Sequence, residues 1–147
     1  MIRFKTSKEV EFNSRQIFDL ILDIEEYSKF LPWVTGSTII TRQDNFIFAE
    51  LDIVFKGYKT SYISKVTTSK CDETYEIVIE SENGPFKTLK NLYKVSPINK
   101  NACLISFDNV VEFHFKIIES LIGLTFSRNV EEIIFAFEAR AKEIYSS

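Results

Sequence analysis

The feature that most constrains this chain is a change in its hydrophobic period. Between residues 33 and 115, apolar and polar residues alternate in six strand-like segments, most of them separated by loop signals. Ala49 and Leu51, for example, share one face of a strand, and Glu50 and Asp52 share the other. The last segment has an apolar side made of Ile105, Phe107, Val111, Phe113 and Phe115. One face of each strand is therefore wet, which predicts an antiparallel sheet rather than a buried parallel one.

Helical signals precede this strand region. A weakly alternating first strand at residues 2–12 ends at Asn13, and Gln16 follows three residues later with an apolar run behind it. This is the pattern of an N-cap with its capping-box partner, and it predicts a short amphipathic helix. A second short helix near residues 25–30 must stop at Pro32, because the residue before a proline avoids the helical region.

Helical spacing returns at the end of the chain. The apolar positions there fit one stripe of a long amphipathic helix: Phe126, Val130, Ile133, Ile134, Phe137, Ala141 and Ile144. We expect Gly123 to mark a joint between this helix and the segment at residues 115–122. The whole pattern predicts one α+β domain over residues 1–147, in which a curved antiparallel sheet of about seven strands surrounds the long C-terminal helix and two short helices follow the first strand.

Length, charge and cysteine content exclude several classes of protein. The 147 residues suffice for one core, and the net charge of −3 disfavours a phosphate backbone, so we expect no DNA partner. Cys71, Cys103 and a single His offer neither a disulfide framework nor a zinc site, so we expect no metal and a reducing, cytoplasmic location. No secretory signal is visible, and the apolar stretch at residues 117–126 is interrupted by Glu119 and far shorter than the ~20 residues that span a bilayer.

The chain is rich in aromatic residues, with 14 Phe, 6 Tyr and 1 Trp against 4 Gly and 3 Pro. Side chains of this size either fill a core densely or surround a large apolar ligand. The sequence alone leaves both interpretations open.

Four spaced motifs bring in a family resemblance. They are YSKFLPW at residues 27–33, AEL at 49–51 with FK at 55–56, GPFK at 84–87 with Leu89, and AF at 136–137 with RA at 140–141. In this order, and spread from end to end, they resemble the ubiquinone-binding START-like family. Its bacterial members are often labelled oligoketide cyclase/lipid transport protein or ribosome association toxin RatA.

The resemblance implies a helix-grip (START/SRPBCC-like) fold with a hydrophobic cavity between the sheet and the C-terminal helix. It also implies noncatalytic binding of ubiquinone or a similar lipid, with no further cofactor. Departures from the family pattern occur at Val34, where Cys is usual, and at Tyr93 and Val95, where a Trp-x-Phe pair is usual. On this basis we expect the cavity wall to consist of Phe30, Leu31, Pro32, Trp33, Phe55, Phe86, Tyr93, Phe107, Phe113, Phe126, Ile133 and Phe137.

Several features have two interpretations. The loop at residues 30–33 either plugs the core or forms the cavity mouth, in which case Trp33 lines an entrance for an apolar tail. The apolar segment at residues 117–126 is either core or a lid that opens against a membrane. His114 falls on the wet side of its strand by alternation, and we expect it at the surface. Gly84 and Pro85 are expected to form a tight turn.

A block of acidic residues at positions 72–82 precedes a basic strip. The strip consists of Lys87, Lys90, Lys94 and Lys100. The two segments either pair Glu with Lys across neighbouring strands, or leave the lysines free to contact anionic lipid headgroups or ribosomal RNA.

Three functions follow from these observations. The leading prediction is a binding and delivery protein for ubiquinone or another isoprenoid lipid, which supports respiration through transient peripheral contact with the inner face of a membrane. The first alternative is a RatA-type inhibitor that binds a ribosomal subunit. The second is a polyketide cyclase or aromatase, for which the sequence offers no convergent acid/base set.

Overall fold

The computed structural model describes residues 1–146. Its elements, in chain order, are β1 (Ile2–Val10), α1 (Ser14–Leu22), the 3-10 helix η1 (Ile24–Lys29), β2 (Val34–Arg42), β3 (Phe46–Phe55), β4 (Tyr58–Cys71), β5 (Thr74–Ser81), β6 (Phe86–Asn99), β7 (Ala102–Phe113), α2 (Lys116–Glu131) and α3 (Ile133–Tyr145).

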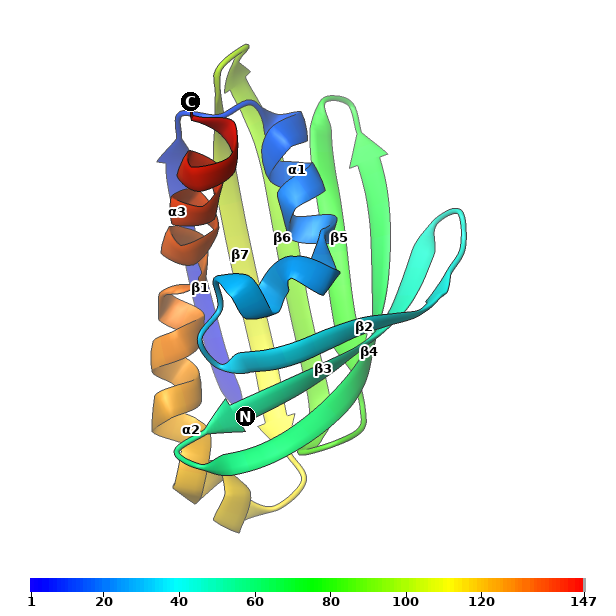
Figure 1. Ribbon diagram of the computed structural model, residues 1–147, viewed down its shortest axis with the longest axis vertical. Coiled ribbons are helices and arrows are strands. Elements are labelled where there is room, and N and C mark those ends of the chain that lie inside the picture. The colour runs from blue at the N-terminus through cyan, green and yellow to red at the C-terminus, as the bar shows by residue number, and fades with distance from the viewer. Residues whose placement is uncertain (147) are drawn as a thin grey trace.

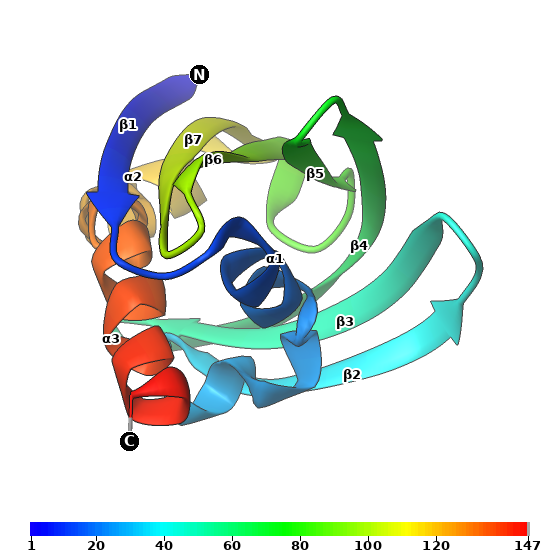
Figure 2. The ribbon, with the colours of Figure 1, turned by 90° about the horizontal axis from the view of Figure 1, so that it is seen from above.

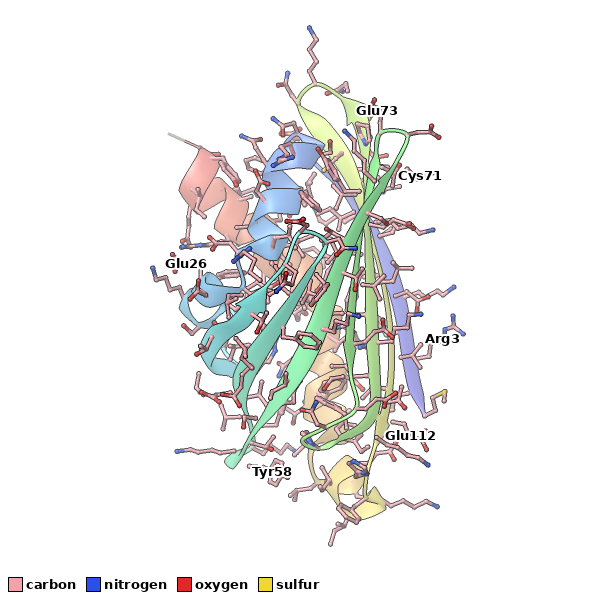
Figure 3. The ribbon with its side chains drawn as sticks, turned by 90° about the vertical axis from the view of Figure 1, so that its right-hand side faces the viewer. Arg3, Glu26, Tyr58, Cys71, Glu73 and Glu112 are labelled. Atoms are coloured by element: carbon pink, nitrogen blue, oxygen red, sulfur yellow. The ribbon has the colours of Figure 1, made fainter. Side chains whose placement is uncertain are left out.

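All seven strands form one antiparallel sheet in the order β1-β7-β6-β5-β4-β3-β2. The sheet is strongly curved, and its concave side wraps around α1 while α2 and α3 lie along its open side (Figures 1 and 2). Strand β4 runs nearly the length of the molecule, with Tyr58 near one end and Cys71 near the other (Figure 3). The predicted α+β helix-grip architecture, with two short helices after the first strand, is confirmed.

The sheet splays between β4 and β5, because their pairing stops at Lys65 and Glu80. The backbone of Ile63 lies beyond this point and is bonded by side chains instead. Asn83 Oδ1 accepts from Ile63 N–H at 2.6 Å, and Asn83 Nδ2 and Ser81 Oγ donate to Ile63 O at 2.8 and 2.7 Å. Gly84 has a φ of +63°, and a Cβ there would lie 2.4 Å from Ser61 O. The predicted turn thus also fastens the splayed half of β4 to the β5–β6 connection.

The N-terminal helical predictions are confirmed. Gln16 N–H donates to Asn13 Oδ1 at 2.8 Å, and Gln16 Oε1 accepts from Asn13 N–H at 3.2 Å, which is a complete capping box. Helix η1 ends at Lys29, before Pro32.

The expected joint at Gly123 is wrong. Gly123 is buried inside α2 and faces β1, where a Cβ would make ordinary contact with Ile2 Cδ1 at 3.9 Å. The C-terminal segment breaks instead at Glu132, whose N–H bonds to the carbonyls of Asn129 and Val130. Among residues 1–146, no helix is long and apolar enough to cross a membrane.

Phe115 does not lie on the inner face of the sheet, which corrects the prediction from alternation. Strand β7 ends at Phe113, and Phe115 is the N-cap residue of α2 with 63% of its surface exposed. The period-two pattern continued past the strand because the turn into α2 carries no glycine or proline signal. His114 is exposed, as expected.

On the convex face the acidic and basic segments pair across neighbouring strands. The register places Glu76 opposite Lys94 and Glu80 opposite Lys90, and Lys94 Nζ lies 3.6 Å from Glu76 Oε1. Lys87 lies 3.8 Å from Glu112 of β7. These exposed pairs contribute little to stability, but they neutralise most of the basic strip.

Candidate ligand-binding site

Two aromatic clusters hold the helices against the sheet. In the first, the Phe126 cluster, the Phe126 ring of α2 lies 5.5–5.9 Å from the rings of Phe55, Phe86 and Phe113. In the second, the Phe137 cluster, the Phe137 ring of α3 lies 5.5–6.0 Å from those of Tyr27, Phe30 and Tyr93, and Tyr93 in turn packs on Phe107. These distances are typical of favourable edge and tilted aromatic pairs, so both clusters are solid core.

A cavity of about 60 Å³ lies between the two clusters, under the break between α2 and α3. Its walls come from η1, the loop before β2, the concave faces of β2–β7, and the two helices. The lining residues are Ile24, Tyr27, Leu31, Trp33, Val34, Leu51, Tyr62, Ser64, Val66, Ile79, Leu89, Asn91, Tyr93, Phe107, Asn109, Phe126, Val130 and Ile133. Most of these lining residues are buried, whereas Trp33 is only partly buried.

The structure divides the twelve residues expected in the cavity wall. Those that line the cavity are Leu31, Trp33, Tyr93, Phe107, Phe126 and Ile133. Phe55, Phe86 and Phe113 pack behind Phe126, and Phe30 and Phe137 pack beside Tyr27. Pro32 is exposed to solvent. Some of the aromatic residues therefore fill the core and others border the cavity, and ligand contact by these residues stays a prediction.

Sequence reasoning missed the polar part of the lining. Asn109 is 1% exposed and Ser64 is 2% exposed, and both point to the concave side together with Asn91. Asn109 Nδ2 donates to Asn91 Oδ1 at 2.5 Å. A signal was present, since Asn91 falls between Leu89 and Tyr93, and Asn109 between Phe107 and Val111, on the apolar sides of their strands.

Three tyrosines bring hydroxyl groups to the same region. Burial raises the pKa of Tyr27, Tyr62 and Tyr93. The proximity of Tyr62 further raises the pKa of Tyr27, and that of Tyr27 and then Tyr62 further raises the pKa of Tyr93. All three phenols are neutral at physiological pH. The Tyr27 hydroxyl donates to the carbonyl of Ile21, which ties η1 to α1.

The cavity therefore suits a ligand that is mainly apolar and carries a small polar group. Among residues 1–146, the side chains that line it include no carboxylate, amine, guanidinium, imidazole or thiol. Such a lining can exclude water and hydrogen-bond a neutral head group.

The fold and this cavity define a helix-grip protein with an interior apolar site. Residues 10–138 match the family model described as polyketide cyclase / dehydrase and lipid transport, and the chain belongs to that family.

Its relatives include proteins named as toxins and a protein named for coenzyme Q binding. The chain is 34% identical over 145 residues to a ribosome association toxin RatA of Rickettsia prowazekii, covering 98% of this chain and 99% of the relative. It is 24% identical over 147 residues to a coenzyme Q-binding protein COQ10 homolog B, mitochondrial, of Xenopus laevis, covering 98% of this chain and 59% of the relative. A START superfamily structure from Mycobacterium smegmatis superposes with a TM-score of 0.79 at 18% identity, covering 97% of this chain and 98% of that one. The resemblance drawn from the motifs is confirmed.

Proposed function

We propose that this protein binds a quinone lipid, with ubiquinone as the leading ligand, and exchanges it with a membrane surface to support respiratory electron transport without reacting with it. The observation that carries the proposal is the interior cavity between the two aromatic clusters, which reaches the partly exposed Trp33. The relative named as a coenzyme Q-binding protein supports the choice of ligand. An isoprenoid tail gains roughly 25 cal/mol for each Å² that leaves water, and an apolar site replaces the bilayer at small net cost.

The cavity must enlarge for this ligand. Its volume of about 60 Å³ is well below the roughly 300–1,000 Å³ of ordinary ligand sites. Helix α2 is the element suited to move, because its inner face supplies Phe126 and Val130 to the cavity while its outer face meets water. On that outer face Ile117, Leu121 and Leu124 are 79%, 55% and 62% exposed.

A membrane would cover this outer face when α2 opens. Each large apolar side chain gains about 1.5–3 kcal/mol when it is fully buried, so three of them on one helix supply substantial binding energy. The same helix would then serve as the lid considered from the sequence. The proposed contact is peripheral, at the inner face of the membrane.

Noncatalytic binding agrees with the side chains in the cavity. A cyclase or aromatase needs a base as well as an acid, and the described lining offers tyrosines that are neutral at physiological pH, a serine and amides but no carboxylate, imidazole or amine. The family description covers both cyclases and lipid transport, so the argument for binding comes from the lining itself.

The proposal is tested with the single tryptophan of the chain. Titration with decylubiquinone should quench Trp33 fluorescence to saturation, and mass spectrometry of the purified protein should detect a copurified quinone. Free N-acetyltryptophanamide titrated in parallel controls for quenching by unbound quinone, and a Trp33→Phe variant should still copurify with the lipid. A protein that carries no extractable lipid and shows no saturable binding would refute the proposal.

A second candidate, binding to a ribosomal subunit, is favoured by the relative named RatA at 34% identity. The charge distribution opposes it, because the net charge is −3 and Glu76, Glu80 and Glu112 lie beside three of the four lysines in the strip. Sedimentation of ribosomal subunits with excess protein tests it. Unchanged association of the subunits would eliminate this function, and a block that persists in a variant with the four lysines replaced by serine would exclude the strip as the contact.

A further inference from the structure

The concave face of the sheet carries a polar pair at its centre. Asn91 of β6 lies directly opposite Asn109 of β7 in the register, and both side chains line the cavity. Their neighbours along the two strands are apolar: Leu89 and Tyr93 flank Asn91, and Phe107 and Val111 flank Asn109. Polar groups in such surroundings are costly unless every hydrogen-bonding atom finds a partner.

One atom of this pair has no partner in the part of the chain that the structure describes. Asn109 Nδ2 donates to Asn91 Oδ1 at 2.5 Å, but Asn109 Oδ1 is buried and accepts no hydrogen bond from residues 1–146. Reversing the Asn109 amide alone would bring two carbonyl oxygens together, so with this bond made Asn109 Oδ1 is left to accept from a donor that enters when the cavity enlarges. A buried carbonyl in this position requires a hydrogen-bond donor.

The tyrosine and serine hydroxyls in the lining behave differently from this carbonyl. A hydroxyl group rotates and either donates or accepts, so Tyr62, Tyr93 and Ser64 adapt to ligands of either kind. Asn109 Oδ1 only accepts. It is therefore the atom in the cavity that discriminates between head groups with and without a hydroxyl donor.

We propose that the cavity selects the reduced form of its lipid, a quinol, whose ring hydroxyl donates to Asn109 Oδ1. This inference rests on the proposed function and adds the redox state of the ligand to it. The oxidised quinone carries only acceptor oxygens, and placing one of them against the Asn109 carbonyl leaves both unpaired. The remaining N–H groups of Asn91 are donors for a second oxygen of the head group.

The preference is measured with two probes that share one tail. Decylubiquinol and decylubiquinone are titrated anaerobically into the wild-type protein, so that the contribution of the tail cancels in the ratio of the two dissociation constants. One neutral hydrogen bond should make the quinol bind about three- to tenfold more tightly. In Asn109→Leu, which is similar in size, the ratio should fall to about one through weaker binding of the quinol.

Ser81→Ala is the matched control. Ser81 is also buried and polar, but its hydroxyl bonds to Ile63 O outside the cavity, so the ratio should stay at the wild-type value. The wild-type ratio needs no variant, which keeps the test valid if Asn109→Leu does not fold. Equal binding of the two probes, tighter binding of the quinone, or an unchanged preference in a folded Asn109→Leu would overturn this inference while the proposed function stands. Binding of neither probe would overturn both.

Discussion

Helices α2 and α3 follow each other in the chain but are attached to the sheet in different ways. Helix α3 buries Ile134 and Phe137, and Lys8 Nζ of β1 lies 3.0 Å from its Glu138 Oε1. Its last residue, Tyr145, donates to Gln16 O of α1 at 3.1 Å. Helix α2 starts at Lys116, and Ile117, Leu121 and Leu124 on its outer face are more than half exposed.

This contrast separates a helix that anchors the fold, α3, from a helix that can open the cavity, α2. Both helices are held by aromatic packing, but α3 is also joined to β1 by the Lys8–Glu138 ion pair and to α1 by the Tyr145 hydroxyl. Helix α2 contributes Phe126 and Val130 to the cavity and is exposed behind them. An element that must move to admit a ligand belongs to the less stable part of a fold, and α2 meets this condition. Four measurements test this difference between the helices.

The largest expected effect is on the free energy of unfolding, when the packing of α3 is weakened. Phe137→Ala removes a fully buried ring that contacts Tyr27, Phe30 and Tyr93, so it should lower the free energy of unfolding by about 3–5 kcal/mol in urea titrations. Phe135→Ala, two residues away and largely exposed, is the control and should cost less than about 1 kcal/mol. Similar losses in the two variants would contradict the anchoring role of Phe137.

The second effect concerns the outer face of α2. Replacing Ile117, Leu121 and Leu124 together by serine should reduce binding to lipid vesicles at least about 100-fold, because three apolar side chains no longer enter the membrane. The free energy of unfolding should change little, since these side chains are exposed in the folded protein. Cosedimentation with vesicles measures the binding.

A double Ile40→Ser, Ile98→Ser variant is the matched control for this experiment. Both isoleucines are about half exposed, but they lie on β2 and β6 rather than on α2. Equal loss of vesicle binding in the control and the α2 variant would show that exposed apolar side chains support vesicle binding wherever they lie on the surface.

The third effect compares the local stability of the helices. Backbone amides of α2 should exchange with deuterium about tenfold or more faster than those of α3, since opening of α2 leaves the α3 contacts intact. Mass spectrometry of peptides from the two helices measures the rates. Equal protection would mean that the helices open only together.

The smallest effect is a pH-dependent contribution from the end of α3. Burial, with help from Asp19 and Asp23, raises the pKa of Tyr145. The stabilisation that comes from its neutral hydroxyl is therefore present below the unfolded pKa of about 10 and is lost as the pH rises through the higher folded value. Tyr145→Phe should cost about 1 kcal/mol near neutral pH and less in alkali, as measured by urea unfolding.

Tyr58→Phe serves as the control because Tyr58 lies at the opposite end of the molecule (Figure 3). Its effect on the free energy of unfolding should be small and should not follow the effect of Tyr145→Phe with pH. A constant loss in Tyr145→Phe at all pH values would contradict the role assigned to the hydroxyl.

The sequence predicted the parts of the fold that depend on near neighbours. Asn13 and Gln16 lie three residues apart, and their mutual bonds form within one helical turn. Strand faces likewise follow from alternation along one segment. The break at Glu132 was missed because the chain there contains neither glycine nor proline. The prediction at Gly123 was wrong because this glycine lies within a continuous helix.

For the candidate site, too, prediction from the sequence was limited to what near neighbours in the chain decide. Leu31, Trp33 and Phe126 were expected in the wall and line the cavity, whereas Phe86 and Phe113 were expected there and pack behind Phe126. Asn109 was overlooked because a polar residue in an apolar series has no meaning until its partner on the neighbouring strand is known. Contacts between segments that are distant in the sequence decide which aromatic rings pack against one another and which line the cavity.

By itself, the sequence determined the element types, the wet and dry faces of the strands, and the family to which the chain belongs, since periodicity and spaced motifs are properties of the linear chain. Only the folded molecule decided that the aromatic residues form two clusters with a small hollow between them, that the outer face of α2 is exposed, and that a buried amide oxygen of a residue lining the hollow has no hydrogen-bond partner among the described residues. The physical reason is that close packing joins residues from separate strands and helices, and no local pattern encodes which of them meet.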